Sequence, residues 1–152
     1  MPRFRSILSL ILVVVTTLLV SCAGPSATTA PTTYTAEKIE QLQVFVAPIE
    51  AARERMSTLA SFIEDENWVD TITLIHGPLG KLRQDMTYLS RSLLPKDQKK
   101  ASQLAKDLFS RFERLDAAAK ARNYSEAVNQ YRQALRDLDA FLDMIPKASE
   151  SA

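Results

Sequence analysis

The sequence has little of what most recognisable sites need, with one cysteine, one histidine and three glycines among 152 residues. One cysteine cannot form an internal disulfide, and together with one histidine it falls short of a zinc finger or a CxxC redox centre. Three glycines, at positions 24, 77 and 80, cannot form a dinucleotide-binding or Walker phosphate loop. A formal net charge of +1 lacks the basic excess typical of proteins that bind nucleic acid. These shortages exclude most familiar chemistry and nucleic acid as a partner.

A catalytic constellation is also missing from the sequence pattern. Serine, aspartate and glutamate are common, but no spacing sets a nucleophile beside a base and an orienting group. Asp137 and Asp139 are two residues apart on a predicted helix, where side chains diverge, and we expect them on a solvated face. We therefore expect that the protein is not an enzyme.

The first residues have the pattern of an export signal. Arg3 and Arg5 precede an apolar run over residues 7–20, which spans about 21 Å as a helix. Crossing a bilayer takes roughly 20 apolar residues, so residues 1–21 predict a secretory signal peptide. The run ends in Leu19-Val20-Ser21-Cys22, which resembles the bacterial lipobox. This ending predicts that Cys22 carries acyl chains such as palmitate and anchors a lipoprotein to a membrane; the alternative is a plain signal peptide with an incidental cysteine.

The residues after Cys22 predict a flexible tether. Residues 23–34 carry no charge and are rich in Thr, Ala and Pro. Twelve such residues reach about 40 Å when fully stretched. We expect the lipidated Cys22 and its tether to occupy 22–34, a folded domain 35–146, and a disordered tail 147–152.

From Thr35 onward, apolar residues recur at intervals of three and four, which is the helical period. Four stretches show it and none alternates with period two, so the sequence predicts an all-α, antiparallel up-down four-helix bundle. Trp68, Tyr124 and Tyr131 fall on the apolar stripes, so we expect them in the core. In the second stretch the stripe is Trp68, Ile72, Ile75, Leu79, Leu82, Met86, Leu89 and Leu93, and in the fourth it is Tyr124, Val128, Tyr131, Leu135, Leu138, Leu142 and Ile145.

Capping residues and prolines predict where these helices begin and break. Thr35 and Asn123 suit N-caps, and Pro95 suits the first turn of the third helix. Pro48 and Pro78 fall inside the first and second stretches and should bend or break them locally. Because the second stripe stays in phase across residues 77–80, we expect a kink there and one continuous helix.

His76, beside this expected kink, is the one imidazole available to a metal. Asp70 and Asp85 are nearby in sequence, so a zinc site would be shallow and rich in carboxylates. The alternative is a boundary histidine that hydrogen-bonds a backbone carbonyl freed at the kink. We expect no bound cofactor, with zinc at His76 kept as an open possibility.

Charge is distributed unevenly along the chain. Residues 95–122 hold eight basic and four acidic side chains, a net of +4, whereas residues 123–145 hold two basic and four acidic, a net of −2. On a helical wheel, five of the basic residues fall within about 120° of arc beside the core stripe. This strip is either a docking surface for an acidic protein face or a solvated face partly neutralised by acidic neighbours. Its members are Lys96, Lys99, Lys100, Arg111 and Arg114.

Several short segments resemble the cyanobacterial branch of the PsbQ family. They are Leu-Ile-His-Gly-Pro-Leu-Gly at 74–80, Arg-Gln-Asp-Met at 83–86, Arg-Ser-Leu-Leu-Pro-Lys-Asp-Gln at 91–98, Asn-Trp-Val-Asp at 67–70 and the Asn-Tyr pair at 123–124. The resemblance covers about residues 35–146, and the lipobox at Cys22 is similar to that branch too. Relatives in higher plants carry a longer N-terminal segment and no lipid, so contacts of that segment do not transfer.

This resemblance implies a non-catalytic, four-helix extrinsic subunit of photosystem II on the lumenal side of the thylakoid membrane. Such subunits help to stabilise the manganese–calcium oxygen-evolving centre and its chloride and calcium requirement. The implied partners are other extrinsic lumenal subunits and the lumenal loops of a chlorophyll-binding core antenna protein. Some family members bind zinc at surface carboxylates and histidines; in this sequence only His76 could supply the imidazole.

A rival interpretation shares every physical feature above. It is a generic membrane-anchored periplasmic lipoprotein whose helical bundle acts as an assembly chaperone or adaptor. A metal carrier, with tight zinc binding through His76, is a third possibility. Only the segments between residues 67 and 98 separate the first interpretation from these two.

Overall fold

A computed structural model describes residues 32–147 of the chain, and all of the regular secondary structure in this range is helical. Five helices are found there, which confirms the all-α expectation for the described part. The predicted signal peptide, Cys22, most of the tether and most of the predicted tail lie outside the described residues. The helices are α2 (Ala36–Glu64), α3 (Trp68–His76), α4 (Leu82–Ser92), α5 (Pro95–Lys120) and α6 (Tyr124–Asp143).

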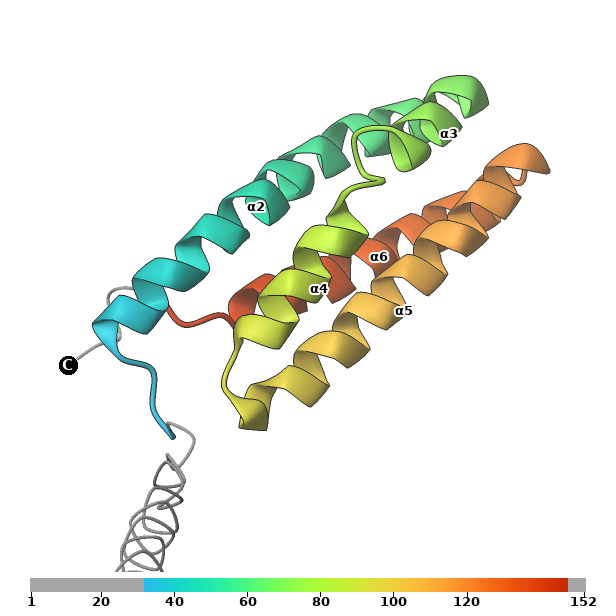
Figure 1. Ribbon diagram of the computed structural model, residues 1–152. Coiled ribbons are helices and arrows are strands. Elements are labelled where there is room, and N and C mark those ends of the chain that lie inside the picture. The colour runs from blue at the N-terminus through green and yellow to red at the C-terminus, as the bar shows by residue number, and fades with distance from the viewer. Residues whose placement is uncertain (1–31, 148–152) are drawn as a thin grey trace, which may run out of the picture. The chain divides into compact units, whose positions relative to one another are not determined.

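Consecutive helices run back and forth along one another (Figure 1). Helix α2 leads to a turn, after which α3 and then α4 return along it, and α5 and α6 form a second long hairpin. The most extensive packing is between α5 and α6; α4 lies against both α2 and α5, and α2 also packs on α6. The short helix α3 bridges α2 and α5. None of these helices is long and apolar enough to span a bilayer.

The helices begin at the residues that the capping pattern predicts. Thr35 Oγ1 accepts a hydrogen bond from the Lys38 N–H at 3.2 Å, and Asn123 Oδ1 accepts one from the Glu126 N–H at 3.1 Å. Pro95 occupies the first turn of α5, where its missing N–H costs no intrahelical bond. These three start signals are confirmed.

The turns that follow α2 and α5 have the same backbone conformation and the same hydrogen-bond pattern. Two residues beyond the end of α2, Glu66 lies in the left-handed region (φ 50°), and two residues beyond the end of α5, Arg122 has the same conformation (φ 53°). In each turn the following asparagine, Asn67 or Asn123, closes a Schellman motif: its N–H bonds back to the helix just ended, at 2.8 Å to Phe62 O and 2.9 Å to Ala118 O. The same asparagine caps the next helix through its side-chain oxygen. One residue therefore ends one helix and begins the next.

The proline inside α2 does not break it. Pro48 lies within a helix that is continuous from Ala36 to Glu64, so a break at this position is ruled out. Val46, Ile49 and Ala52 on either side of Pro48 are buried, and their packing holds the helix together despite the lost hydrogen bond.

The expectation of one continuous, kinked second helix is wrong. Helix α3 ends at His76 and α4 starts at Leu82, with a compact loop between them. Pro78 disfavours helical backbone at the preceding Gly77, and the Gly80 N–H bonds to Gly77 O at 3.0 Å to close a turn. Leu79 is buried at the loop's tip, which is why the apolar stripe stays in phase although the helix does not continue.

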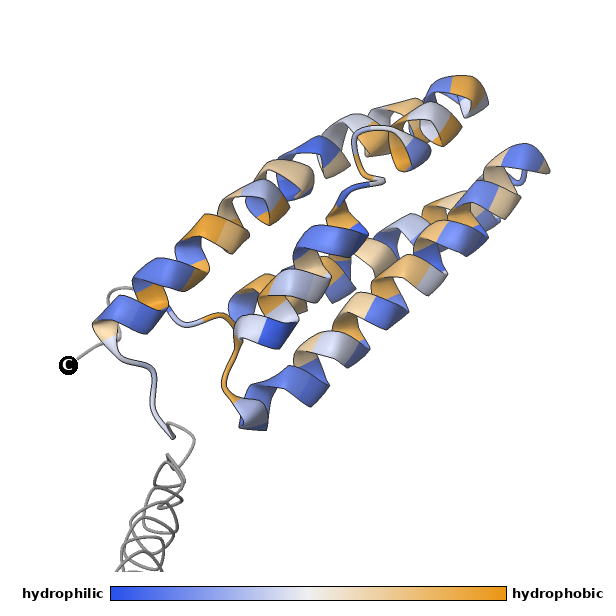
Figure 2. Ribbon diagram, in the orientation of Figure 1, coloured by the Kyte–Doolittle hydropathy of each residue, from blue (hydrophilic) through white to orange (hydrophobic). Residues whose placement is uncertain are grey.

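Apolar residues line the interior faces of all five helices, and polar residues cover their outer faces (Figure 2). The buried residues of α6 differ in part from the apolar stripe that the sequence predicts. These buried residues are Ala127, Gln130, Ala134, Leu138 and Phe141. Tyr124 is 44% exposed, so its assignment to the core is wrong, whereas Trp68 and Tyr131 are partly buried and pack against the core. Alanines occupy buried positions of α6, and larger side chains such as Tyr131 and Leu135 are partly buried beside them.

Candidate docking site

A groove runs between the α3–α4 loop with α4 on one side and α5 on the other. It consists of two adjoining hollows of about 400 and 310 Å³, which share Arg83 and Phe109 as walls. We call it the α4–α5 groove, with an apolar chamber near the α3–α4 loop and a basic chamber towards the start of α5. The apolar chamber lies where the chain leaves the helical path at residues 77–81, and the basic chamber lies between the regular helices α4 and α5.

The apolar chamber has a hydrophobic floor and a charged rim. Ile75, Leu79, Phe109 and Phe112 form the floor, and the two phenylalanine rings meet edge to face with centroids 6.0 Å apart. The guanidinium of Arg83 lies 4.4 Å from the centre of the Phe109 ring.

Ion pairs tie the rim of this chamber together. Arg83 donates a hydrogen bond of 3.0 Å to Glu113, and His76 Nε2 lies 2.9 Å from Asp116 Oδ1. Lys120 donates to the other oxygen of Asp116 at 2.6 Å. Burial alone would raise the pKa of Asp116, but the hydrogen bonds from Lys120 and His76 outweigh it and hold that pKa below its usual range. Asp116 is therefore an ionised anchor between α3 and α5.

His76 thus has a partner that the sequence did not indicate. It contacts a carboxylate of α5 and not a backbone carbonyl freed at the loop, so the expected carbonyl contact is wrong. Asp70 accepts a hydrogen bond from the side chain of Asn67, and Asp85 lies 3.4 Å from Lys81. Within residues 32–147, no three His, Cys, Asp or Glu side chains gather into a group that could hold a metal.

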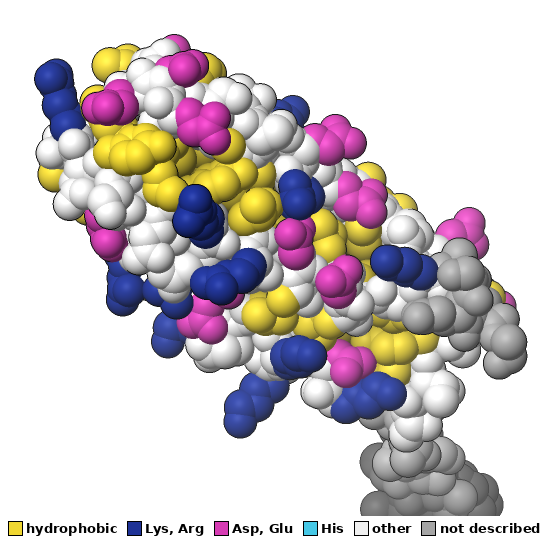
Figure 3. All heavy atoms as spheres, turned by 180° about the vertical axis from the view of Figure 1, so that it is seen from behind, with side chains coloured by type: hydrophobic (Ala, Val, Ile, Leu, Met, Phe, Trp, Pro, Cys, Tyr) yellow, Lys and Arg dark blue, Asp and Glu magenta, His cyan; other side chains and the backbone are white. Residues whose placement is uncertain are grey.

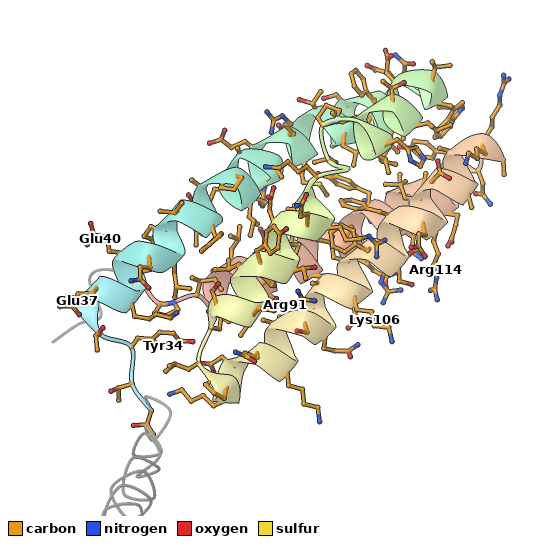
Figure 4. All side chains as sticks on the ribbon, in the orientation of Figure 1. Tyr34, Glu37, Glu40, Arg91, Lys106 and Arg114 are labelled. Atoms are coloured by element: carbon orange, nitrogen blue, oxygen red, sulfur yellow. The ribbon has the colours of Figure 1, made fainter. Side chains whose placement is uncertain are left out.

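The basic chamber contains cations that lack acidic partners. Arg91 on α4 and Lys106 on α5 both line it and are exposed, and neither forms an ion pair with a described residue (Figure 4). Ser90, in the same wall, is 2% exposed, and its Oγ has no hydrogen-bond partner among the described residues. Sequence reasoning missed Arg83, Arg91 and Ser90, because the basic strip was sought on one helix and this chamber joins two.

The structure splits that strip. Lys96, Lys99, Lys100 and Arg114 are exposed on α5. Arg111 is half-buried, and its Nε lies 3.7 Å from Asp137 Oδ2 of α6, so its charge is directed inward. Lys96 Nζ lies 6.0 Å from the centre of the Tyr34 ring.

The Asp137 side chain is 24% exposed, so the expectation of a solvated face is wrong for it, whereas the Asp139 side chain is 43% exposed. Asp139 pairs with Arg53 of α2, while Asp137 faces Arg111 of α5. Burial raises the pKa of Asp137, against the lowering effect of Arg111. The two carboxylates do diverge, as their spacing predicts, and each joins α6 to a different neighbour.

Tyr34 fixes the end of the predicted tether to the folded domain. Its hydroxyl donates to Asp97 Oδ2 at 2.7 Å and accepts from the Leu94 N–H at 3.1 Å, at the turn between α4 and α5 (Figure 4). Burial and the bond to Asp97 raise the pKa of Tyr34 to about 12. The chain therefore meets the domain beside Lys96, which is a placement that sequence reasoning did not give.

The face opposite the groove offers no surface of one sign. In Figure 3, basic and acidic side chains are interspersed over that face, with apolar patches between them. Mixed charge of this kind is typical of a solvated surface. The α4–α5 groove is the more distinctive feature of the described residues.

These features define a class: a helical scaffold with ion pairs between its helices and a charged groove on its surface. The sequence matches the family described as PsbQ, oxygen evolving enhancer protein 3, over residues 3–146. The chain belongs to the PsbQ family, which comprises non-catalytic extrinsic subunits of photosystem II on its lumenal side. It is 61% identical over 150 residues to "CyanoQ" of Synechocystis sp. (strain ATCC 27184 / PCC 6803 / Kazusa), a match that covers 98% of this chain and 100% of that protein.

Proposed function

We propose that this chain docks on the lumenal surface of photosystem II and stabilises the oxygen-evolving centre, in contact with the core and other extrinsic lumenal subunits. The observation that carries the proposal is the match to the PsbQ family, with 61% identity to CyanoQ over nearly the whole chain. The charged α4–α5 groove and the ion-paired helices suit a binding role. Covering the lumenal surface would slow the exchange of the inorganic ions beneath it.

The proposal includes a lipid anchor on Cys22. Residues 1–21 act as the signal peptide, 22–34 as the lipidated cysteine and tether, 35–146 as the folded domain and 147–152 as the tail. The domain works as a four-helix bundle in which α3 and α4 together form one of the four rods. Confinement to the thylakoid membrane raises the effective concentration near membrane-bound partners, so that a weak interface is well occupied.

Exposed lysines at the start of α5 are the first docking candidates. Lys96, Lys99, Lys100 and Arg114 point away from the core and are free to meet an acidic surface, whereas Arg111 acts through its pairing with Asp137. Charge of this kind contributes to the rate and register of encounter more than to affinity. No cofactor takes part in this proposal.

Affinity purification from isolated membranes tests this function. A tagged copy expressed at native level should recover photosystem II core proteins, and the tag should be found in the thylakoid fraction. Recovery with periplasmic or outer-membrane proteins alone would contradict the proposal and favour a generic lipoprotein adaptor. An untagged strain provides the background.

A further inference from the structure

We propose that the α4–α5 groove is the site that receives an acidic polypeptide segment of the partner, with a carboxylate in the basic chamber and an apolar side chain in the apolar chamber. This inference rests on the proposed function, because it assumes that the chain docks on a protein complex. It names a different surface from the strip of lysines along α5.

Charge complementarity is the first argument. Arg91 and Lys106 project from neighbouring helices into one chamber, and neither has an acidic partner among the described residues. The half-buried charges Arg53, Asp139, Arg111 and Asp137 have partners within the domain, whereas these two exposed cations have none. Two free cations on facing walls suit a carboxylate, which accepts hydrogen bonds at both oxygens.

The second argument is an unsatisfied hydroxyl in the same wall. Ser90 Oγ is buried and has no hydrogen-bond partner among the described residues. A buried polar group without a partner costs free energy, and native structures contain few of them. An acceptor brought into the basic chamber would supply the missing partner.

The third argument is the spacing of the two chambers. Lys106 and Phe112 are six residues apart on α5, which is about 9 Å along the helix. An extended segment covers this distance in about three residues. A carboxylate and an apolar side chain about three residues apart would therefore reach both chambers together.

The rim of the apolar chamber favours a polypeptide over a lipid. Glu113 and Asp116 are carboxylates at this rim, and backbone N–H groups of a peptide can donate to them. A lipid chain has no donor to offer and would bring its apolar surface against charged groups. We therefore assign the groove to a peptide segment and treat lipid binding as an outcome of the test.

The experiment measures binding of the full-length, tagged protein to photosystem II complexes purified from cells that lack it. The Arg91→Glu/Lys106→Glu variant should bind at least tenfold more weakly than the unaltered protein. The matched control is Arg132→Glu/Lys147→Glu, which changes the net charge equally at two exposed positions away from the groove and should stay within twofold. Circular dichroism and urea unfolding establish that both variants fold; Arg91→Gln/Lys106→Gln replaces the first variant if it does not.

Each outcome decides a different question. If the unaltered protein binds and the groove variant binds equally well, the groove inference is overturned while the proposed function stands. If the unaltered protein itself does not bind, both are overturned. A second measurement compares binding of the same proteins to vesicles of phosphatidylglycerol. If the groove variant binds these vesicles more weakly but binds the complexes as well as the unaltered protein does, the groove is a lipid site and the peptide assignment is overturned.

A photo-crosslinking residue in place of Thr87, which lines the basic chamber, gives an independent readout. Cross-linked peptides should contain an acidic residue with an apolar residue about three positions away. Peptides without acidic residues would contradict the inference. The same crosslinker in place of the exposed Asn129 on α6 is the control.

Discussion

At the scale of single residues, Tyr34 links two distant parts of the chain. It joins the end of the predicted tether to the α4–α5 turn through two hydrogen bonds, to Asp97 and from Leu94. Neither partner is close to it in sequence. The hydroxyl therefore holds the start of the described chain against the α4–α5 turn.

We expect Tyr34→Phe to lower the free energy of unfolding by about 1–2 kcal/mol at pH 7, since two hydrogen bonds are lost. The raised pKa of Tyr34 adds a pH dependence. The folded protein keeps a proton up to about pH 12 that the unfolded chain releases near pH 10, so stability should fall between these values. Urea unfolding from pH 8 to 12 measures both effects. Tyr124→Phe, which alters an exposed hydroxyl, should leave the curve unchanged, and an equal high-pH loss in Tyr34→Phe would contradict the assignment.

The lowered pKa of Asp116 predicts a change in protein stability at acid pH. Its lowered pKa means that its stabilising effect is present above about pH 4 and is lost as the pH falls through the lower folded value. Asp116→Asn should therefore reduce the free energy of unfolding by about 1 kcal/mol at pH 7, with a difference that shrinks below pH 4. Denaturant unfolding at pH 3 and pH 7 checks this. Asp143→Asn, at an exposed position without an ion pair in the described residues, is the control; a pH-independent difference in Asp116→Asn would count against the ion pairs.

Residues that act locally could be predicted from the sequence, and residues that act across helices could not. Thr35, Pro95 and Asn123 act on backbone groups within one helical turn, so residue type and position suffice to predict where their helices begin. The pairs Arg53–Asp139 and His76–Asp116 join positions 86 and 40 residues apart. Such pairs depend on which helices become neighbours and on how each is rotated.

At the scale of elements, the two turns closed by Asn67 and Asn123 hold a residue other than glycine in the left-handed region. This conformation costs a residue with a Cβ roughly 1 kcal/mol. We expect Glu66→Gly to raise the free energy of unfolding by about 0.5–1 kcal/mol, partly offset by the greater freedom of glycine in the unfolded chain. Glu54→Gly, at an exposed position inside α2, should instead lower it by about 1 kcal/mol. Thermal and urea unfolding measure both, and a loss of stability in Glu66→Gly would refute the argument.

The α3–α4 loop depends on Gly80. A Cβ at this position would meet the carbonyl oxygen of His76, and backbone cannot move aside as a flexible side chain can. Gly80→Ala should therefore lower the free energy of unfolding by about 1–3 kcal/mol and disturb the apolar chamber. Gln84→Ala, an exposed change on α4, serves as the control in the same urea titration. Unchanged stability in Gly80→Ala would show that the loop relaxes freely.

The loop also shows where periodicity misleads. Ile75, Leu79 and Leu82 keep the helical spacing, yet Leu79 reaches the core from a loop. A compact turn that replaces one helical turn leaves the spacing of buried residues intact, so the pattern alone cannot separate a kink from a break. In α6 the pattern instead misplaces the buried face of the helix. The buried alanines and Gln130 carry less apolar signal than the flanking Tyr131 and Leu135, which are only partly buried.

At the scale of the whole molecule, binding depends on two terms: the contact made by the folded domain and the confinement that we propose for Cys22. The described domain presents a groove lined by unpaired cations and, along α5, further exposed lysines, while ion pairs such as Arg53–Asp139 lie between its helices. A contact made by this groove and the exposed lysines alone is expected to be weak. The tether that we propose for residues 22–34 would supply an effective concentration on the order of millimolar, which would let a weak contact be occupied.

The last prediction separates these terms. Cys22→Ala, expressed behind a cleavable secretory signal peptide without a lipobox, should leave the unfolding curve of the purified protein unchanged, because the described helices do not include Cys22. At native expression its occupancy on photosystem II should fall several-fold, measured as the ratio of this protein to a core subunit in purified complexes. Overexpression should restore the occupancy, since a higher concentration replaces the lost confinement by mass action. Ser21→Ala in the natural leader keeps the cysteine and should behave as the unaltered protein. Full occupancy of Cys22→Ala at native expression would show that the folded domain holds its partner without the anchor, and the tether would then serve delivery alone.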